Sequence, residues 1–375
     1  MRSRIGTRLT GWAGVLGGNL VTALILLAVF LVTESRHTQF ATSQATNFSL
    51  FLLLVCSMQL MLGFSDQSSL MHAAVYGMGA YVAVYMEAKT GTPLIVALLA
   101  AVASGAVLGA VLAYPLSRLR EHFFAMATLA AQVILSQTFE NLNSLTGGVN
   151  GEATVHPSLN SLPLLALILA IGFLIIAATR SFKSSRLGRR VLALREDETM
   201  ARSEGVNVTR LRIVMVMISF AIASGSGFFL AETSGFISPD GFTLTSSLAV
   251  IVAVIVGGRS LTWGALVGAG AYSALTGETI NTPGLSVLIL GIVLVVVLAY
   301  LPKGITGFRL ATWFNRFTPS GYDGSTKGID PLAPVGVEQL AVGPSERRKF
   351  PFRRSPDRDH ALDEPDLQPG GSHVG

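Results

Sequence analysis

The chain has 375 residues, of which half are apolar and 13% are charged, and its mean hydropathy is +0.57. This composition excludes an ordinary soluble domain and indicates a polytopic membrane protein, because apolar runs recur from residue 11 to residue 301. The net charge of +5 calls for no nucleic-acid partner, since basic and aromatic residues are not interleaved.

The apolar runs predict an all-α fold of about ten transmembrane helices, with eight to ten as the approximate range. A bilayer core about 30 Å thick needs roughly 20 helical residues, and a helix satisfies its own backbone hydrogen bonds in lipid. The shorter runs, 48–63, 69–86, 244–257 and 262–277, are also consistent with broken or re-entrant helices. In chain order the predicted spans are about 11–33, 48–63, 69–86, 93–116, 123–140, 162–179, 213–231, 244–257, 262–277 and 285–301.

Basic residues predict which side of the membrane each loop occupies. Arg2, Arg4 and Arg8 precede the first span, and nine basic residues lie in the loop 180–212. Ten alternations place both on the cytoplasmic side and leave only Arg36 and Lys89 outside. We therefore predict that the N-terminus and the C-terminus are both cytoplasmic.

The composition changes after residue 317. Residues 318–375 hold eight of the fifteen prolines and few aromatic residues, so this segment cannot bury enough apolar surface to fold. We predict a transmembrane domain over 1–317, with the cytoplasmic loop 180–212, and a disordered cytoplasmic tail over 318–375.

The sequence contains no pattern of an enzyme or a cofactor site. It has no G-x-x-x-x-G-K-[ST], G-x-S-x-G or H-E-x-x-H motif and no cluster of cysteine and histidine. We therefore expect no catalytic residues, no metal site and no bound cofactor in this chain.

Two stretches combine small and polar residues. In "GFSDQSSLMHAAVYGMGAY" (63–81), Asp66 and His72 require a cavity or a polar partner if they lie at membrane depth. "SLTGGVNGE" (144–152) is a glycine-rich turn on the predicted outer face. Its backbone N–H groups are compatible with an anion-binding concavity or with a plain surface turn.

The segment "ALREDETMARSEGVNVTR" (193–210) is unusually charged for this chain. The positive-inside bias explains its arginines but not its four acidic residues. A short charged helix that docks on a soluble partner and a solvated connector both remain open interpretations.

Several motifs in order resemble permease subunits of branched-chain amino acid ABC importers. "SSRLGRRVLALREDETMARSEGVNVTRLRIV" resembles the family's cytoplasmic loop, and "DQSSLMHAAVYGMGAY" resembles a motif in one of its early spans. "MATLA", "TGGVNG", "SGFISPDGF", "VGGRSLTWGALVGA" and "LPKGITG" follow in family order, so the resemblance covers about residues 48 to 308. The sequence departs from it at Asp66 and Met71, where the family usually has glycine.

The resemblance implies a multi-pass protein of the cell inner membrane that works with separate subunits. A second permease subunit would complete the substrate pathway, two ATPase subunits would bind ATP, and an extracytoplasmic binding protein would deliver the solute. Residues 188–205 would be the coupling segment on the ATPase, with Arg195, Glu196, Asp197, Glu198, Ala201 and Gly205 as its matched positions.

The resemblance also suggests residues along the substrate pathway. Each of them is equally compatible with a buried hydrogen bond between helices. They are Gln67, Ser69, His72, Thr128, Gly147, Gly148 and Asn150.

Other functions remain as alternatives. Related permeases carry urea, short amides or monosaccharides. A secondary transporter driven by an ion gradient would use Asp66, Glu232 or Glu278, although Glu232 and Glu278 are expected in solvent near the outer ends of spans. A third alternative is a membrane scaffold that binds soluble proteins.

Overall fold

The computed structural model describes ten segments of the chain, all within one compact unit, Met1–Tyr322. Side chains are described from residue 17 onward, except at residue 121. The predicted tail and most of the span 285–301 lie outside the described residues. The segments are 2–36, 38–117, 119, 121–154, 162–185, 188–192, 201–202, 207–258, 263–276 and 291–292.

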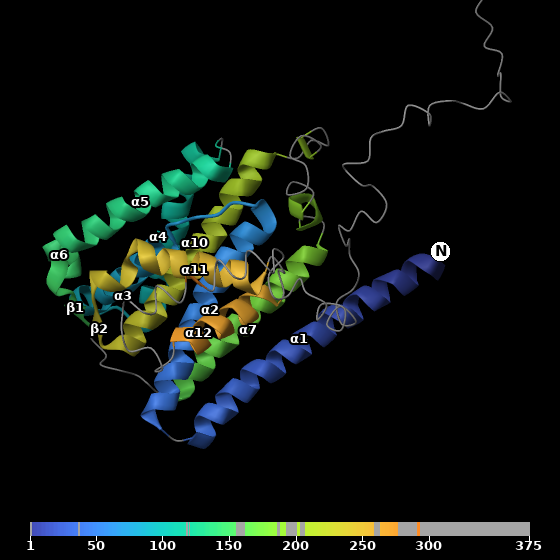
Figure 1. Ribbon diagram of the computed structural model, residues 1–375, viewed down its shortest axis with the longest axis horizontal. Helices are drawn as coiled ribbons and strands as arrows, with labels where there is room; N and C mark the ends of the chain where they lie inside the picture. Colours follow the sequence, from blue (N-terminus) through green and yellow to red (C-terminus); the bar gives the residue numbers. More distant parts are fainter. Residues whose placement is uncertain are drawn as a thin grey trace, which may run out of the picture. The chain divides into compact units, whose positions relative to one another are not determined.

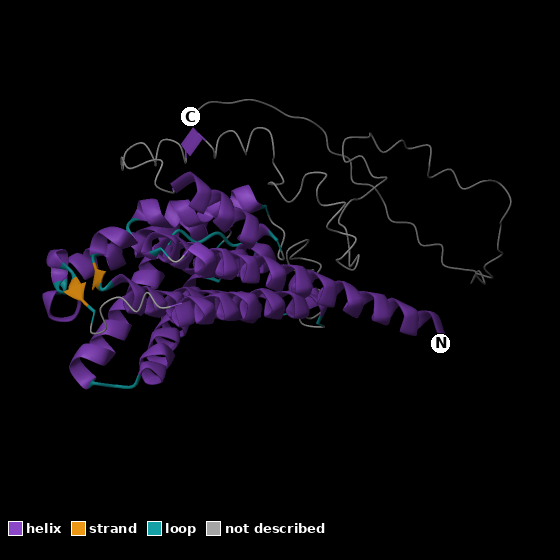
Figure 2. Ribbon diagram, turned by 90° about the horizontal axis from the view of Figure 1, so that it is seen from below, coloured by secondary structure: helices purple, strands orange, loops and turns teal. Residues whose placement is uncertain are grey.

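The described residues are almost entirely helical (Figures 1 and 2). Nine of the ten predicted spans coincide with helices in this part of the chain. The long helices are α1 (Arg2–Arg36), α2 (Gln39–Ser65), α3 (His72–Thr90), α4 (Leu94–Leu116), α5 (Glu121–Asn141), α7 (Leu162–Ser184) and α10 (Val208–Ser234). The shorter ones are α6 (Asn143–Thr146), α11 (Leu244–Gly257), α12 (Gly264–Thr276) and the 3-10 helices η1 (Gly148–Asn150) and η2 (Pro239–Phe242).

Local sequence sets several helix ends. The Thr38 hydroxyl accepts a hydrogen bond from the Ala41 N–H at the start of α2, and the Asn207 side chain accepts one from the Arg210 N–H at the start of α10. Helices α3 and α10 each end before a glycine with positive φ, Gly91 at 58° and Gly235 at 67°.

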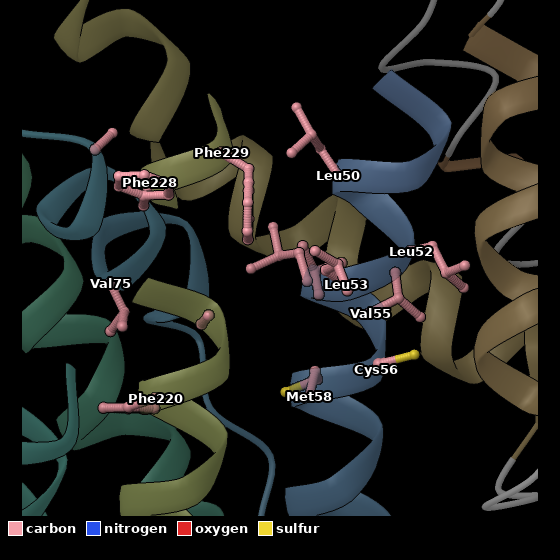
Figure 3. Packing of buried hydrophobic residues seen from close by; sticks show 14 of the residues in the cluster. Leu50, Leu52, Leu53, Val55, Cys56, Met58, Val75, Phe220, Phe228 and Phe229 are labelled. Atoms are coloured by element: carbon pink, nitrogen blue, oxygen red, sulfur yellow. The ribbon is translucent and has the colours of Figure 1, made fainter. Parts of the chain in front are cut away.

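Five described helices are long and apolar enough to cross a membrane: Gly17–Arg36 of α1, and α2, α4, α7 and α10 in full. Helix α2 lies at the centre, in contact with α1, α7, α10, α11 and α12. Figure 3 shows Leu53 and Met58 pointing towards α10 while Leu52 and Cys56 point away from it. Because α2 is apolar on all sides, it can be buried on all sides.

Glycines bring α10 into backbone contact with α3. A Cβ atom added to Gly79 would meet the Ser224 carbonyl oxygen, and one added to Gly227 would meet the Tyr76 carbonyl oxygen. The two helices run in the same direction, because His72 at the start of α3 contacts Ser219 and Glu87 near the end of α3 meets Glu232 near the end of α10. Small residues thus hold the two helices together by close approach, as they do in membranes.

The predicted spans 244–257 and 262–277 form helices that are too short to cross a bilayer alone. At 1.5 Å per residue, the 14 residues of α11 extend about 21 Å, against about 30 Å of hydrocarbon. The two helices pack on each other, and a Cβ atom on Gly257 or Gly268 would meet the backbone of the other helix. The Gln59 side chain on α2 donates to the Gly258 carbonyl at 3.1 Å, which anchors the end of α11 inside the helical core.

The all-α prediction is wrong in one detail. Two short strands, β1 (Glu152–Ala153) and β2 (Phe236–Ile237), pair antiparallel, with Glu152 opposite Ile237. They join the loop after α5 to the loop after α10, so each loop gains backbone partners that a single exposed turn would lack.

Candidate functional site

The chain leaves the helical conformation between α2 and α3 while it is still buried. Helix α2 ends at Ser65, Asp66 has a φ of 53°, and α3 begins only at His72. Gln67 and Ser69 in between are at most 2% exposed. This break, defined as residues 66–71, falls between the predicted spans 48–63 and 69–86, and α3 begins three residues later than the second span was predicted to begin.

Side chains satisfy the backbone of the break. The Leu70 N–H donates to the Thr128 hydroxyl on α5 at 3.1 Å, and the Met71 N–H donates to the Ser69 hydroxyl at 3.3 Å. Non-helical backbone at membrane depth needs such partners, because lipid supplies none. Ser69 and Thr128, two predicted pathway residues, therefore have a structural role.

The first N–H groups of α3 are also occupied. The Ala73 N–H donates to the Ser247 hydroxyl on α11, and the Ala74 N–H donates to the Gln132 side-chain oxygen on α5, both at 3.0 Å. Gln132 also accepts from Ser247 at 3.0 Å and donates to the Phe242 carbonyl at 2.7 Å. Gln132 and Ser247 thus tie the start of α3 to α5, α11 and η2.

His72 is fully buried beside the break, and its hydrogen bonds define its tautomer. The Ser219 hydroxyl on α10 donates its one proton to the Ser57 carbonyl on α2 at 2.7 Å. The 3.0 Å contact between His72 Nε2 and Ser219 Oγ therefore requires Nε2 to donate. The other ring nitrogen, Nδ1, is then unprotonated and accepts no hydrogen bond from a described residue, although the Ser69 backbone lies next to the ring.

Gln67 differs from the other polar groups of the break. Its side chain is 2% exposed, and among the described residues neither its amide nitrogen nor its amide oxygen has a hydrogen-bond partner. A buried polar group without a partner costs about 1–3 kcal/mol. Gln67 and His72 are consequently the two predicted pathway residues at the break that retain free hydrogen-bonding capacity.

Three other predicted pathway residues lie elsewhere, in the loop after α5. Gly147 and Gly148 have φ values of 70° and 63°, and Asn150 is exposed. The Gly148 N–H donates to the Thr146 hydroxyl, and the Gly151 N–H donates to the Gly148 carbonyl. Since these donors are used within the loop, the geometry favours a structural turn over an anion-binding concavity.

Only one predicted coupling residue falls within the described residues. Ala201 is 2% exposed and packs against Val208 and Leu211, so its side chain is buried against α10 of the same chain. Val191 nearby is also fully buried, against Phe64 and Met215. The described parts of the loop are thus anchored on α2 and α10. The predictions for Arg195, Glu196, Asp197, Glu198 and Gly205 lie outside the described residues.

The expectation that Glu232 lies in solvent is wrong. Glu232 is 1% exposed because α3 and α10 pack closely up to their ends, where it meets Glu87, which is 9% exposed. One oxygen of each carboxyl group is buried and has no hydrogen-bond partner in the part of the chain that the structure describes. Glu278, the other acid expected there, lies outside the described residues.

Sequence reasoning missed Gln132, Ser219 and Ser247. Gln132 lies four residues after Thr128, so helical spacing alone places the two on one face of α5. Ser219 and Ser247 carry no comparable signal, because single serines are common in apolar helices.

Known proteins resemble this chain over most of its length. Residues 40–298 match the family described as "Branched-chain amino acid transport system / permease component". The high-affinity branched-chain amino acid transport system permease protein LivM of Escherichia coli (strain K12) is 27% identical over 76% of this chain and 74% of its own length. Its counterpart from Salmonella typhimurium is 26% identical over 76% of this chain and 73% of its own length.

More distant permeases match shorter regions. The ribose import permease protein RbsC of Escherichia coli (strain K12) is 28% identical over 45% of this chain and 54% of its own length. No solved structure matches the chain. The family match includes α2, the break, α3, α5, α10 and α11 and leaves out α1. The chain therefore belongs to the permease components of the branched-chain amino acid transport family and is a multi-pass membrane subunit of an ABC importer.

Proposed function

We propose that this chain forms the translocation pathway for branched-chain or related amino acids, together with a second permease subunit. Separate ATPase subunits bind and hydrolyse ATP, and an extracytoplasmic binding protein delivers the solute. The observation that carries the proposal is the buried break at 66–71, where Gln67 in the break and His72 directly after it offer free polar atoms inside the helical core.

The chemistry of the break suits an amino acid with an apolar side chain. The free groups are an amide donor, an amide acceptor and an imidazole acceptor, and most of the buried side chains of α2 and α10 are apolar. Ligand sites commonly combine such an apolar lining with a few polar groups that fix orientation. Leucine, isoleucine or valine would match both properties.

The charged loop is the proposed contact with the ATPase. Val191 and Ala201, which come before and after the loop's first coupling positions, are both buried against the chain's own helices. Arg195, Glu196, Asp197, Glu198 and Gly205 are the proposed coupling positions. Replacement of Glu198 and Gly205 together should lower substrate-stimulated ATP hydrolysis, and unchanged hydrolysis would remove the coupling assignment.

A monosaccharide is the second candidate solute, because the similarity to the ribose import permease covers part of the chain. Competition in the assembled transporter separates the candidates. We expect unlabelled leucine, but not ribose, to block uptake of labelled leucine.

Purification by a tag on this chain tests the proposed subunits. An ATPase and a second permease should be retained in detergent at fixed ratios. Repeated recovery of this chain without an ATPase would contradict the proposal.

A further inference from the structure

A small apolar cluster joins the charged loop to the membrane helices. We call Phe64, Val191 and Met215 the junction cluster; each is at most 4% exposed. Phe182 also packs against it, with its ring edge-to-face to Phe64 at a centroid distance of 5.2 Å. The cluster is separate from the main core around the middle of α2 and α10.

The three members come from different parts of the chain. Val191 belongs to the helical residues 188–192, four residues before Arg195. Phe64 is the next-to-last residue of α2, and Met215 lies in α10. The junction cluster therefore links the start of the proposed coupling segment to two membrane helices.

One route from the cluster leads to Gln67. Phe64 is two residues before Asp66, where φ becomes positive and α2 ends, and Gln67 follows directly. Interiors packed at crystal-like density transmit displacement, since they contain little free volume to absorb it. A shift of Val191 against Phe64 would accordingly move the start of the break.

A second route leads to His72. Met215 and Ser219 are four residues apart and therefore lie on one face of α10. Ser219 holds His72 Nε2 at 3.0 Å and donates to the Ser57 carbonyl on α2 at 2.7 Å. Both groups with free hydrogen-bonding capacity at the break are thus connected to the junction cluster.

We propose that Phe64, Val191 and Met215 are positioning residues that carry movement of the charged loop to the substrate-facing groups of the break. The inference rests on the proposed function, because it needs an ATPase to move the loop. It adds a specific mechanical contact, formed by apolar packing and not by the charged residues.

A matched pair of substitutions in the full transporter tests the contact. Val191→Ala and Val55→Ala remove the same atoms from valines that are both 0% exposed, but Val55 belongs to the main core. We expect Val191→Ala to lower the solute transported per ATP hydrolysed by roughly 2- to 30-fold, the range for mutations that alter coupling between sites. Val55→Ala should leave that ratio unchanged. The inference is overturned if the two variants change the ratio equally or if neither changes it.

Cross-linking gives an independent test. Phe64→Cys and Val191→Cys are combined with Cys56→Ala, which removes the single native cysteine. Without a cross-linker, this variant should transport little solute per ATP. A short bifunctional thiol reagent should restore the ratio by rejoining α2 to the loop. A ratio that stays low after complete cross-linking would overturn the inference.

Different results would contradict the proposed function and the role of the junction cluster. Absence of ATP-dependent uptake in the unsubstituted complex would remove the proposed function. Normal ATP-dependent uptake, combined with a Val191→Ala variant that matches Val55→Ala, would remove only the role of the junction cluster.

Discussion

At the scale of single residues, Asp66 shows how the break is made. Within the described part of the chain it is the one non-glycine residue with positive φ, 53°, and it caps the end of α2. The left-handed conformation is unfavourable for residues with a Cβ atom by about 1–2 kcal/mol, although Asp tolerates it better than most. Glycine, which the motif resembled by this stretch would place here, would carry no such strain.

Two substitutions at residue 66 isolate the effect of the left-handed backbone conformation on stability. Asp66→Gly and Asp66→Ala both remove the carboxyl group, so their difference in stability reports the conformational preference alone. We expect the Ala variant to be less stable than the Gly variant by about 1 kcal/mol, because only glycine is free of strain there. Thermal unfolding of the purified protein in detergent measures the difference, and equal stabilities would contradict the strain.

Gln67 and Gln132 are both buried glutamines, but they differ in whether their side-chain amides make hydrogen bonds. Gln132 makes hydrogen bonds to Ala74, Ser247 and Phe242, whereas no described residue hydrogen-bonds to the Gln67 amide. Gln67→Leu should keep or raise the free energy of unfolding and lower solute uptake. Gln132→Leu should lower the free energy of unfolding by about 1–3 kcal/mol, because it leaves a buried N–H and a buried carbonyl unpaired.

Unfolding and uptake measured on both variants decide this prediction. If Gln67→Leu transports normally, Gln67 is not part of the pathway. If Gln132→Leu is as stable as the original protein, the described hydrogen bonds do not hold the start of α3.

The sequence was informative about part of this site. Gln67, Ser69, His72 and Thr128 are among the polar residues that the family resemblance suggests for the pathway, and the structure gathers all four at the break. The sequence could not predict which polar groups at the break have hydrogen-bond partners and which do not. The partners lie 58 to 174 positions away in the chain, such as Thr128 for Leu70 and Ser247 for Ala73. Gly147, Gly148 and Asn150 lie in the loop after α5 and not at the break. The sequence could not show this separation either, because it does not give the distance between residues that are far apart in the chain.

At the scale of helices, the contact between α3 and α10 sets the position of the break. Gly227 meets the backbone of α3 at Tyr76 and Ala80, and Gly79 meets that of α10 at Ser224. These helices carry His72 and Ser219, so their separation fixes the hydrogen bond between the two side chains. Any Cβ atom at Gly227 must push the helices apart.

Gly227→Ala should therefore destabilise the protein by about 1–3 kcal/mol, the usual effect of overpacking. Gly270→Ala is the control, because nothing lies within 4 Å of the added Cβ atom in α12. There alanine should be neutral or stabilise by up to about 1 kcal/mol, since it favours a helix more than glycine does. Thermal unfolding of both variants tests this, and a Gly227→Ala variant as stable as Gly270→Ala would contradict the close approach.

Most helices were predictable because length and apolar composition suffice to define them. The start and end of α4 and α11, for example, were predicted within one residue. The pairing of β1 with β2 was not predictable, since each strand has two residues and its partner lies more than 80 positions away. The packing of α11 and α12 as short helices within the core could not be predicted either. It depends on a long-range contact, the hydrogen bond of Gln59 with Gly258.

At the scale of the whole molecule, the predicted sides of the membrane still require a test. Single cysteines at Ser144 and Ser184, both exposed, flank α7 and are placed in the Cys56→Ala background. A membrane-impermeant maleimide added to intact cells should label Ser144→Cys and should reach Ser184→Cys only after permeabilisation. The positive-inside distribution is the reason for this expectation. Labelling of both positions from outside would reverse or remove the predicted topology.

For the whole molecule, the main proposal is that ATP hydrolysis by the partner ATPases drives transport. The most direct measurement is uptake of labelled leucine into proteoliposomes that contain this chain, its partner permease and the ATPases, with the binding protein on the outer side. The account predicts uptake that requires ATP on the ATPase side and persists when proton and sodium gradients are dissipated. Uptake driven by such a gradient in the absence of ATP would contradict it.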